Sequence, residues 1–207
     1  MNKKNFPLLL AILGALILLP TLFLDDEPEL PTLPQTLKGV FVDSPSVELP
    51  KFSMTDHNGN PVTNSMFIGK WSLVFFGYTS CPDVCPTTMA VMEKLKRDKA
   101  TPKDTQYIFV SVDPKRDTAE VLKEYVTYFS DDFVGVTGPR KEIDKFKEPL
   151  GVVYDYEGDT SSDEYIVNHF AAIYLIDPNG KQRAYILPPH SLQQVSEAYQ
   201  LIHSHYN

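Results

Sequence analysis

The sequence predicts an α/β domain with a mostly parallel central sheet. Short apolar runs typical of buried strands, such as Trp71 to Gly77, alternate with amphipathic segments such as Thr87 to Lys99. Strand–helix–strand alternation implies parallel strands joined by right-handed crossovers. The chain has 207 residues, of which 43% are hydrophobic. This is enough for one domain with a sizeable core.

The expected elements follow one another along the chain. We expect strands at 47–54, 71–77, 106–112 and 133–137, helices at 87–99, 117–129, 139–148 and 191–203, and a loop at 154–163. The turns at 56–59 and 177–180 predict two hairpins, one leading to Pro61 and Val62 and the other joining strands 169–177 and 182–187. This order fits a thioredoxin-like three-layer α/β/α sandwich with an N-terminal hairpin, in which the second hairpin adds antiparallel strands at one side.

The N-terminal segment predicts a membrane anchor. Residues 7–24 carry no charge, and eighteen residues at about 1.5 Å each span roughly 27 Å. Lys3 and Lys4 precede this run and acidic residues follow it, which places residues 1–6 in the cytoplasm. A cleaved signal peptide is the alternative, although no small-x-small cleavage site follows the run.

We therefore expect a single-pass protein of the bacterial inner membrane, with its domain facing the periplasm or outer side. Residues 25–44 are acidic and Pro-rich at their start, and they are expected to form an extended linker to a domain at 45–207. The formal net charge of −8 argues against a nucleic-acid partner, because such partners call for a basic face.

The two cysteines of the chain, Cys81 and Cys85, lie just after the strand at 71–77. A pair this close can form a disulfide, exchange one, or bind a metal. A structural disulfide would close a loop of about five residues, and short loops give the least stabilisation. Pro86 is tolerated only in a first helical turn, so the helix should begin near Val84 to Pro86. Both sulfurs would then lie near a positive helix end that favours thiolates.

A third metal ligand would have to come from a histidine. His169 stands at the head of the apolar run 170–176, whose start should face the cysteine turn in the proposed fold. Taken alone, such a histidine is more often a structural hydrogen-bonding residue than a ligand. For the other histidines we expect other roles: His57 in a solvated turn, His190 at the start of the last helix, and His203 and His205 exposed near the C-terminus.

Three ordered blocks resemble the Sco/SenC family. They are Phe-Phe-Gly-Tyr-Thr-Ser-Cys-Pro-Asp-Val-Cys-Pro-Thr-Thr at 75–88, Val-Ser-Val-Asp-Pro-Lys-Arg-Asp-Thr at 110–118, and Tyr-Ile-Val-Asn-His at 165–169 followed by Ile-Tyr-Leu-Ile-Asp-Pro-Asn-Gly at 173–180. The family comprises membrane-anchored, thioredoxin-like copper proteins involved in assembling cytochrome c oxidase. The resemblance spans roughly residues 45 to 205.

By this resemblance Cys81, Cys85 and His169 are copper ligands. Two thiolates and an imidazole suit Cu(I) by their softness, and a fourth position could complete Cu(II), although zinc also accepts such a set. The sequence departs from the family at Asn168, where Asp is common, and at Phe170, where a small hydroxyl residue is expected. A carboxylate at 168 could orient the imidazole, whereas Asn supplies only a neutral hydrogen bond.

Three functions remain open at this point. The first is a copper metallochaperone that serves the dinuclear copper site of a cytochrome c oxidase subunit. The second is a thiol–disulfide oxidoreductase that reduces the cysteines of that site, with Cys81 and Cys85 as the redox pair. The third is a copper or redox sensor. Besides the oxidase subunit, we expect another copper chaperone or a thiol reductant as a partner. The membrane is expected to bind the N-terminal anchor.

Overall fold

The structure, a computed structural model, describes residues 29–207. The predicted cytoplasmic segment at 1–6, the predicted anchor at 7–24 and the start of the predicted linker lie outside these residues. Among the residues that the structure describes, no helix is both long and apolar enough to cross a membrane.

The elements alternate much as the sequence predicts. The strands of residues 29–207 are β1 (Val40–Glu48), β2 (Met54–Asp56), β3 (Pro61–Val62), β4 (Trp71–Gly77), β5 (Thr105–Ser111), β6 (Val134–Thr137), β7 (Tyr154–Glu157), β8 (Ile166–His169), β9 (Ile173–Ile176) and β10 (Lys181–Ile186). The helices are α2 (Val84–Arg97), α3 (Ala119–Phe129), α4 (Arg140–Lys147) and α5 (Leu192–Tyr206), with a short 3-10 helix η3 (Asn64–Phe67).

The main sheet has a parallel centre, as predicted. Its strand order is β1-β10-β9-β4-β5-β6-β2-β3, in which β4, β5 and β6 are parallel. Antiparallel strands flank this centre on both sides, whereas the sequence predicts them on one side. The difference arises because the hairpin β2–β3 pairs with β6, so that the N-terminal hairpin also joins the sheet.

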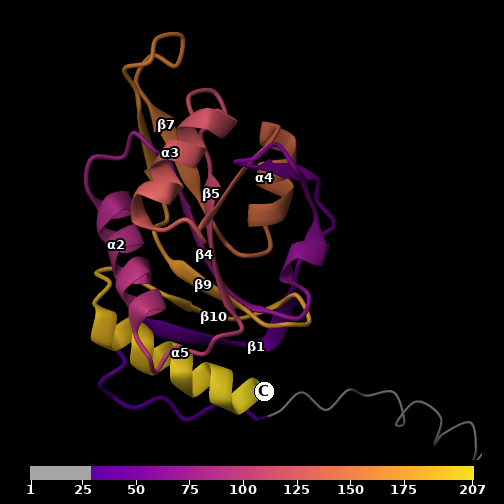
Figure 1. The fold of residues 1–207 in the computed structure, drawn as a ribbon, viewed down its shortest axis with the longest axis vertical. Helices are drawn as coiled ribbons and strands as arrows, with labels where there is room; N and C mark the ends of the chain where they lie inside the picture. Colours follow the sequence, from indigo (N-terminus) through magenta and orange to yellow (C-terminus); the bar gives the residue numbers. More distant parts are fainter. Residues whose placement is uncertain (1–28) are drawn as a thin grey trace, which may run out of the picture.

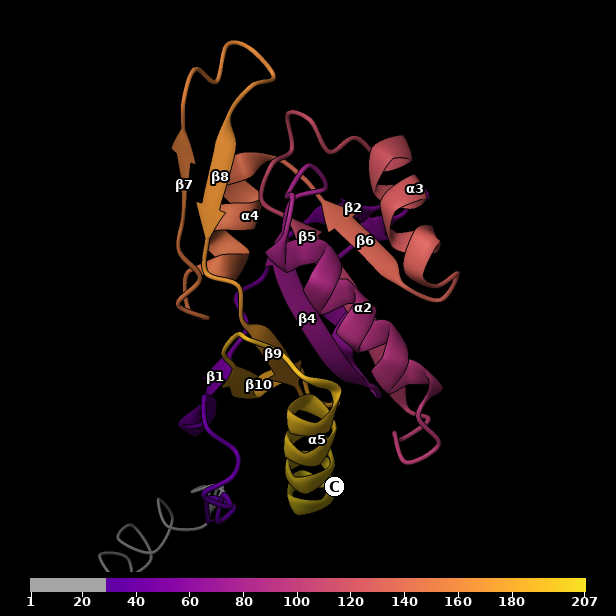
Figure 2. The ribbon, with the colours of Figure 1, turned by 90° about the vertical axis from the view of Figure 1, so that its left-hand side faces the viewer.

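Three layers form around this sheet. The crossovers β4–α2–β5 and β5–α3–β6 step in the same direction, so right-handed connections place α2 and α3 on one face. Figure 2 shows these two helices on one side of the sheet, with α4 and the β7–β8 hairpin on the other. Figure 1 shows α5 crossing the lower end of the molecule. The arrangement confirms the predicted thioredoxin-like sandwich.

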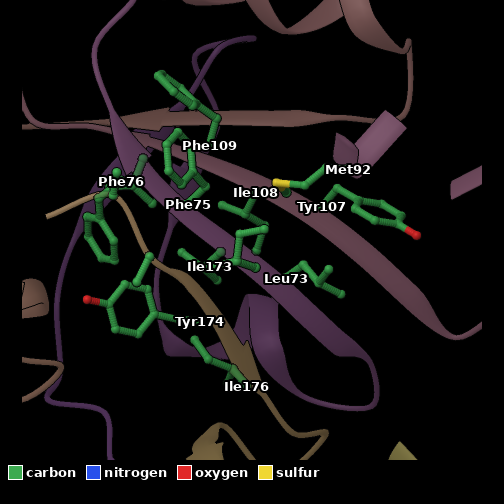
Figure 3. Close-up of a cluster of buried hydrophobic side chains, with 14 of the residues drawn as sticks. Leu73, Phe75, Phe76, Met92, Tyr107, Ile108, Phe109, Ile173, Tyr174 and Ile176 are labelled. Atoms are coloured by element: carbon green, nitrogen blue, oxygen red, sulfur yellow. The ribbon is translucent and has the colours of Figure 1, made fainter. Parts of the chain in front are cut away.

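The core is centred on β4. Every residue of this strand is buried, because parallel central strands are covered on both faces. The ring of Phe75 lies 6.2 Å from that of Phe109 on β5, and the ring of Phe76 lies 5.6 Å from that of Tyr174 on β9. Figure 3 shows these rings gathered where the three strands meet. Each buried side chain of this size contributes about 1.5–3 kcal/mol to folding.

The strand predicted at 47–54 is wrong in its bounds. Two strands occupy this region, and they lie at opposite edges of the sheet: β1 pairs with β10, and β2 pairs with β6. Pro50 lies between them and has no N–H to donate to a sheet ladder. Strand β1 begins at Val40, inside the segment assigned to the linker, because its pairing partner comes from a distant part of the chain.

The region from 154 to 177 also differs from the prediction. The expected loop at 154–163 begins with strand β7, which pairs with β8 as a separate two-stranded ribbon. The strand expected at 169–177 is interrupted: His169 ends β8, and β9 begins at Ile173. The Phe170 N–H donates to the Val153 carbonyl at 2.8 Å, which keeps the chain on the ribbon before it turns into the main sheet.

Candidate metal centre

Both cysteines lie at the start of α2, as the position of Pro86 predicts. The helix begins at Val84 after the N-cap Asp83, whose side chain makes no capping hydrogen bond. Cys81 lies in the preceding loop, and Cys85 is the second helical residue. Pro86 is third, where a helical N–H would have no intrahelical partner. Neither cysteine forms a disulfide in this structure.

Gly77, the last residue of β4, leaves room for the Cys85 sulfur. A Cβ at this position would lie 2.8 Å from Cys85 Sγ and 2.9 Å from Phe109 Cε2, closer than side chains approach one another. Cys85 is fully buried, so its sulfur has no space to retreat. The Gly-Tyr-Thr-Ser-Cys run therefore needs its glycine for packing around the sulfur.

The two thiols differ in proton affinity. The pKa of the Cys81 thiol is lowered to about 3, first by the hydrogen bond that the Cys85 thiol donates to it. Burial opposes this effect, while His169 and the N–H groups of Asp83 and Cys85 add hydrogen bonds that favour the thiolate. The pKa of Cys85 is raised by the bond it donates to Cys81 and by its burial. The helix end is expected to favour thiolate at both sulfurs, whereas the hydrogen bond between the thiols lowers the pKa of Cys81 and raises that of Cys85.

His169 completes the cluster from the end of β8. Its Nε2 lies 3.3 Å from Cys85 Sγ, and the ligand atoms of Cys81, Cys85 and His169 all lie within 4.8 Å of one another. The expectation that this histidine faces the cysteine turn is therefore confirmed. Its place in the fold is not the expected one, since it ends a ribbon strand rather than starting β9.

Aromatic rings fix the imidazole. The ring of Tyr78 lies 5.9 Å from that of His169 and the ring of Phe75 lies 6.0 Å from it, both edge to face. Burial raises the pKa of the Tyr78 phenol, and the charge of Cys81 and a side-chain hydrogen bond to it add to this effect. Within the described chain, His169 Nδ1 is buried without a hydrogen-bond partner. The imidazole is therefore held mainly by ring packing, with Nε2 toward the sulfurs.

An arginine holds the ribbon that carries His169. Arg116 Nη1 donates to the carbonyls of Asp163 at 3.0 Å and Tyr165 at 2.8 Å, in the segment just before β8. Its guanidinium stacks 3.6 Å above the Tyr165 ring and pairs with the buried Asp113. Tyr165 Oη in turn donates to Asp113 Oδ1 at 2.6 Å. This network joins the β5–α3 loop to the ribbon.

The two departures from the family pattern lie outside the cluster. Asn168 Nδ2 donates to Glu157 Oε2 at 3.0 Å across the ribbon, so its side chain does not contact the imidazole. Adjacent residues of a strand point to opposite faces, which explains this orientation. Phe170 is 39% exposed, with its ring 6.5 Å from that of Tyr185.

The four remaining histidines are not part of the metal-binding cluster. His57 is buried, and its Nδ1 accepts a hydrogen bond from the Gly135 N–H at 3.0 Å. The expectation that His57 is solvated is therefore wrong. His190 precedes α5, as expected, and also contacts Thr88 Oγ1 at 3.0 Å. His203 is not freely exposed, because it packs against Trp71, while His205 contacts the Glu29 carbonyl.

The donor set fits a soft metal ion. Two sulfurs and one imidazole nitrogen converge in a partly buried site, and the lowered pKa of Cys81 favours a thiolate at one of the sulfurs. Such a set matches Cu(I) or Zn(II), while hard cations such as Mg²⁺ prefer oxygen.

Comparison with known protein families gives a clear relationship. A family described as SCO1/SenC matches residues 43–203. The chain belongs to the SCO1/SenC family. The match includes Cys81, Cys85 and His169, and also the β5–α3 loop and the ribbon that Arg116 joins.

Individual relatives agree with this membership. The mitochondrial SCO1 homolog of Homo sapiens is 38% identical over 134 residues, which cover 63% of this chain. An SCO2-like protein of Rickettsia felis is 36% identical over 151 residues, which cover 70% of this chain and 72% of that protein. The matched region spans only 44% of the human protein and 47% of its Mus musculus counterpart.

Solved structures of SCO1/SenC proteins share the fold. ScoI of Arabidopsis thaliana with copper bound has a TM-score of 0.68 at 30% identity, covering 76% of this chain and 99% of that one. ScoI of Bradyrhizobium japonicum with copper bound has a TM-score of 0.63 at 35% identity, with the same coverage. BsSco, a Sco-family protein in which a disulfide switch has been identified, has a TM-score of 0.59 at 26% identity and covers 78% of this chain and 97% of that one.

Sequence reasoning missed several residues that shape this SCO1/SenC site. Gly77 and Tyr78 lie inside the first motif, and Arg116 lies inside the second. Their presence in these motifs was the signal available from the sequence. The contacts of Gly77 with Cys85 and of Tyr78 with Cys81 could not be read from it, because they depend on how the loop between them folds back. The contacts of Arg116 with the ribbon could not be read from it because they join distant segments.

Proposed function

We propose that this protein is a copper metallochaperone that delivers copper to the dinuclear copper site of cytochrome c oxidase. The observation that carries the proposal is the convergence of the Cys81, Cys85 and His169 ligand atoms within 4.8 Å. Family membership adds support, since SCO1/SenC relatives have been solved with copper bound.

The three side chains would hold the ion as cargo. Cys81 offers a thiolate without losing a proton, while Cys85 must release one to the solvent or to a base. The site lies in a loop at the end of the sheet, where Cys81 is 8% exposed and His169 is half-buried. An acceptor thiolate can approach such a site from one side and exchange ligands one at a time.

We place the protein in the bacterial inner membrane, with residues 7–24 as a single anchor and the domain on the outer side. The partner is then the oxidase subunit that carries the dinuclear copper site, and another copper chaperone or a thiol reductant supplies copper or electrons. The charge-free run and the flanking Lys3 and Lys4 support this placement.

A thiol–disulfide oxidoreductase is the second candidate. The low pKa of Cys81 favours it, because a thiolate is the nucleophile in disulfide exchange. Cys85 lies within 4.8 Å as the resolving thiol. This function needs both cysteines but not His169, and that difference separates the two candidates.

The test is an anaerobic Cu(I) titration of the full chain in detergent, with a competing chelator. His169→Ala should weaken binding by more than the roughly 10–100-fold that loss of an outer-shell partner costs, because a direct ligand is removed. The variant should still form and exchange a Cys81–Cys85 disulfide. His205→Ala is the matched control, since this histidine lies far from the sulfurs, and it should bind as wild type. Equal affinity in His169→Ala and wild type would show that the proposed site is wrong.

A further inference from the structure

The chain enters the described domain at one end of the sheet. Glu29, the first described residue, accepts a hydrogen bond from His205 near the end of α5. Trp71 opens β4 at the same end: its N–H donates to the Asp104 carbonyl at 3.0 Å and its indole to Asn207 Oδ1 at 3.1 Å. We call this end, where Glu29, Trp71, Asp104 and Asn207 meet, the tether pole.

The metal centre lies at the opposite end. Strand β4 leaves the tether pole at Trp71 and reaches the cysteine loop after Gly77. Seven residues at about 3.3 Å each separate the two ends by roughly 20 Å. Helix α2 runs back from Cys85 toward the tether pole, where its last residues lie. Figure 2 shows the loop after α2 toward the end that holds α5, with the β7–β8 ribbon at the other end.

A basic cavity opens at the tether pole. Its volume is about 570 Å³. Five of the chain's 19 Lys and Arg residues line it, but only two of its 27 Asp and Glu residues do. The five cations are Lys70, Lys96, Arg97, Lys99 and Lys103. A chain with a net charge of −8 thus gathers positive charge at the end that holds Glu29, the first described residue.

Three of these cations are available to a ligand. Lys96 pairs with Asp132 at 2.6 Å, and Arg97 pairs with Glu93. Lys70, Lys99 and Lys103 are exposed, and they form no ion pair within residues 29–207. The second acidic lining residue, Asp98, accepts the Ala100 N–H at 3.0 Å.

A buried hydroxyl adds a polar group to the cavity wall. Tyr107 lines the cavity and is 3% exposed, and its Oη has no hydrogen-bond partner within the described chain. Leaving a buried hydroxyl without a partner is unfavourable, so a ligand that accepts its hydrogen bond is favoured. Lysine ammonium groups and a phenol form a donor set suited to phosphate oxygens.

We propose that this cavity binds the phosphate group of an anionic phospholipid, so that the domain docks on the membrane by its tether pole. The proposal goes beyond copper delivery and rests on the anchor predicted at residues 7–24. A linker from an anchor to Glu29 would bring this pole, rather than the metal centre, to the bilayer surface. Anionic lipid headgroups attract each nearby Lys or Arg by about fivefold in the binding constant.

Docking by this pole would turn the copper site outward. The Cys81–Cys85–His169 cluster would then lie farther from the bilayer than the tether pole, by roughly the 20 Å length of β4. An acceptor domain standing above the membrane could reach it without displacing the protein.

The test uses the full chain reconstituted in vesicles with dansyl-labelled headgroups. Trp71, the single tryptophan of the chain, lies at the tether pole and is the energy-transfer donor. Transfer should be higher in vesicles containing phosphatidylglycerol than in pure phosphatidylcholine, and it should fall with added salt. Lys99→Gln with Lys103→Gln should lower the docked-to-undocked ratio about 25-fold, or fivefold for each cation.

The matched control is Lys123→Gln with Lys141→Gln. These lysines are also exposed, but they lie on α3 and α4 outside the cavity, so docking should be unchanged. Tyr107→Phe should also weaken docking, because it removes only the hydroxyl that would contact the headgroup. Copper affinity should be that of wild type in all of these variants.

Three outcomes would overturn the proposal. Equal transfer in both vesicle types would show that the domain does not dock. An unchanged ratio for Tyr107→Phe would show diffuse attraction by surface lysines and no headgroup in the cavity. Binding of inorganic phosphate without any vesicle preference would assign the cavity to a soluble anion. Failure of the anchor is recognised separately, by release of the protein in a carbonate wash.

Discussion

At the scale of single residues, Cys81 and Cys85 are chemically distinct although they lie only four residues apart. Cys81 accepts hydrogen bonds from the Cys85 thiol, from His169 and from two backbone N–H groups, and these lower the pKa of its thiol to about 3. Cys85 is more deeply buried and donates to Cys81, which raises its pKa. At neutral pH the pair therefore holds one proton, on Cys85.

Copper binding should release about one proton between about pH 7.5 and pH 9. Cys81 lies above its lowered pKa throughout this range and has no proton to lose, whereas Cys85 lies below its raised pKa and must lose one. The apparent Cu(I) affinity should then rise about tenfold per pH unit. Calorimetry in buffers of different ionisation enthalpy measures the protons released. Release of two protons from wild type would contradict the assignment.

At the scale of elements, the metal centre depends on the ribbon β7–β8. The ribbon is not part of the main sheet, so sheet hydrogen bonds do not fix its position. Arg116 supplies the fixing contacts through two carbonyls and the Tyr165 ring. Lys115 adds bonds to the carbonyls of Thr160 and Ser162, both at 2.9 Å, from a half-exposed position.

Arg116→Lys should loosen the ribbon and weaken copper binding. Lysine keeps the charge but loses the forked donors and the ring stacking, which leaves the buried Asp113 poorly paired. We expect a loss in stability smaller than the roughly 3–5 kcal/mol of removing the charged partner outright, and a loss of about 10–100-fold in Cu(I) affinity. Urea unfolding, chelator competition and hydrogen exchange over residues 154–169 measure these effects.

Lys115→Ala is the control for this prediction. It removes contacts with the same ribbon, but the side chain is exposed and should contribute less than about 1 kcal/mol. If both variants lowered copper affinity equally, Arg116 would have no special positioning role.

At the scale of the whole molecule, the two candidate functions make different demands. Delivering copper requires ligands from two segments, with Cys85 and His169 separated by 84 positions. Reducing an acceptor disulfide requires only the cysteine loop. The variant His169→Ala should therefore lose copper binding but keep the Cys81–Cys85 pair that disulfide exchange requires.

A strain without this gene should lose cytochrome c oxidase activity and regain it with added copper, because the metal can then reach the oxidase unaided. The gene carrying His169→Ala should fail to restore activity at low copper, while the His205→Ala gene should succeed. Oxidase activity in membranes is the measurement. Restoration by the His169→Ala gene, or by a small thiol reductant in place of copper, would favour the oxidoreductase.

Much of the fold could be predicted because local signals carried it. Strand β4 is a continuous apolar run, and Pro86 located the start of α2 by steric exclusion from a helix interior. The ribbon was missed at β7, because the alternation of Tyr154 and Tyr156 with acidic residues covers only four residues and runs into a polar turn. Strand β1 was misplaced because its pairing with β10 is a long-range contact.

The sequence by itself determined the α/β class, the position of both cysteines at a helix start, and, through its three motifs, the candidate ligands. These features depend on residues close together in the chain, where periodicity and backbone sterics act directly. Only the tertiary structure decided that His169 ends a ribbon strand, that Arg116 holds that ribbon, and that the two thiols differ in pKa. The first two depend on contacts between distant segments, and the third depends on the burial and hydrogen bonding of two nearby thiols. These distances and this burial exist only once the chain has folded.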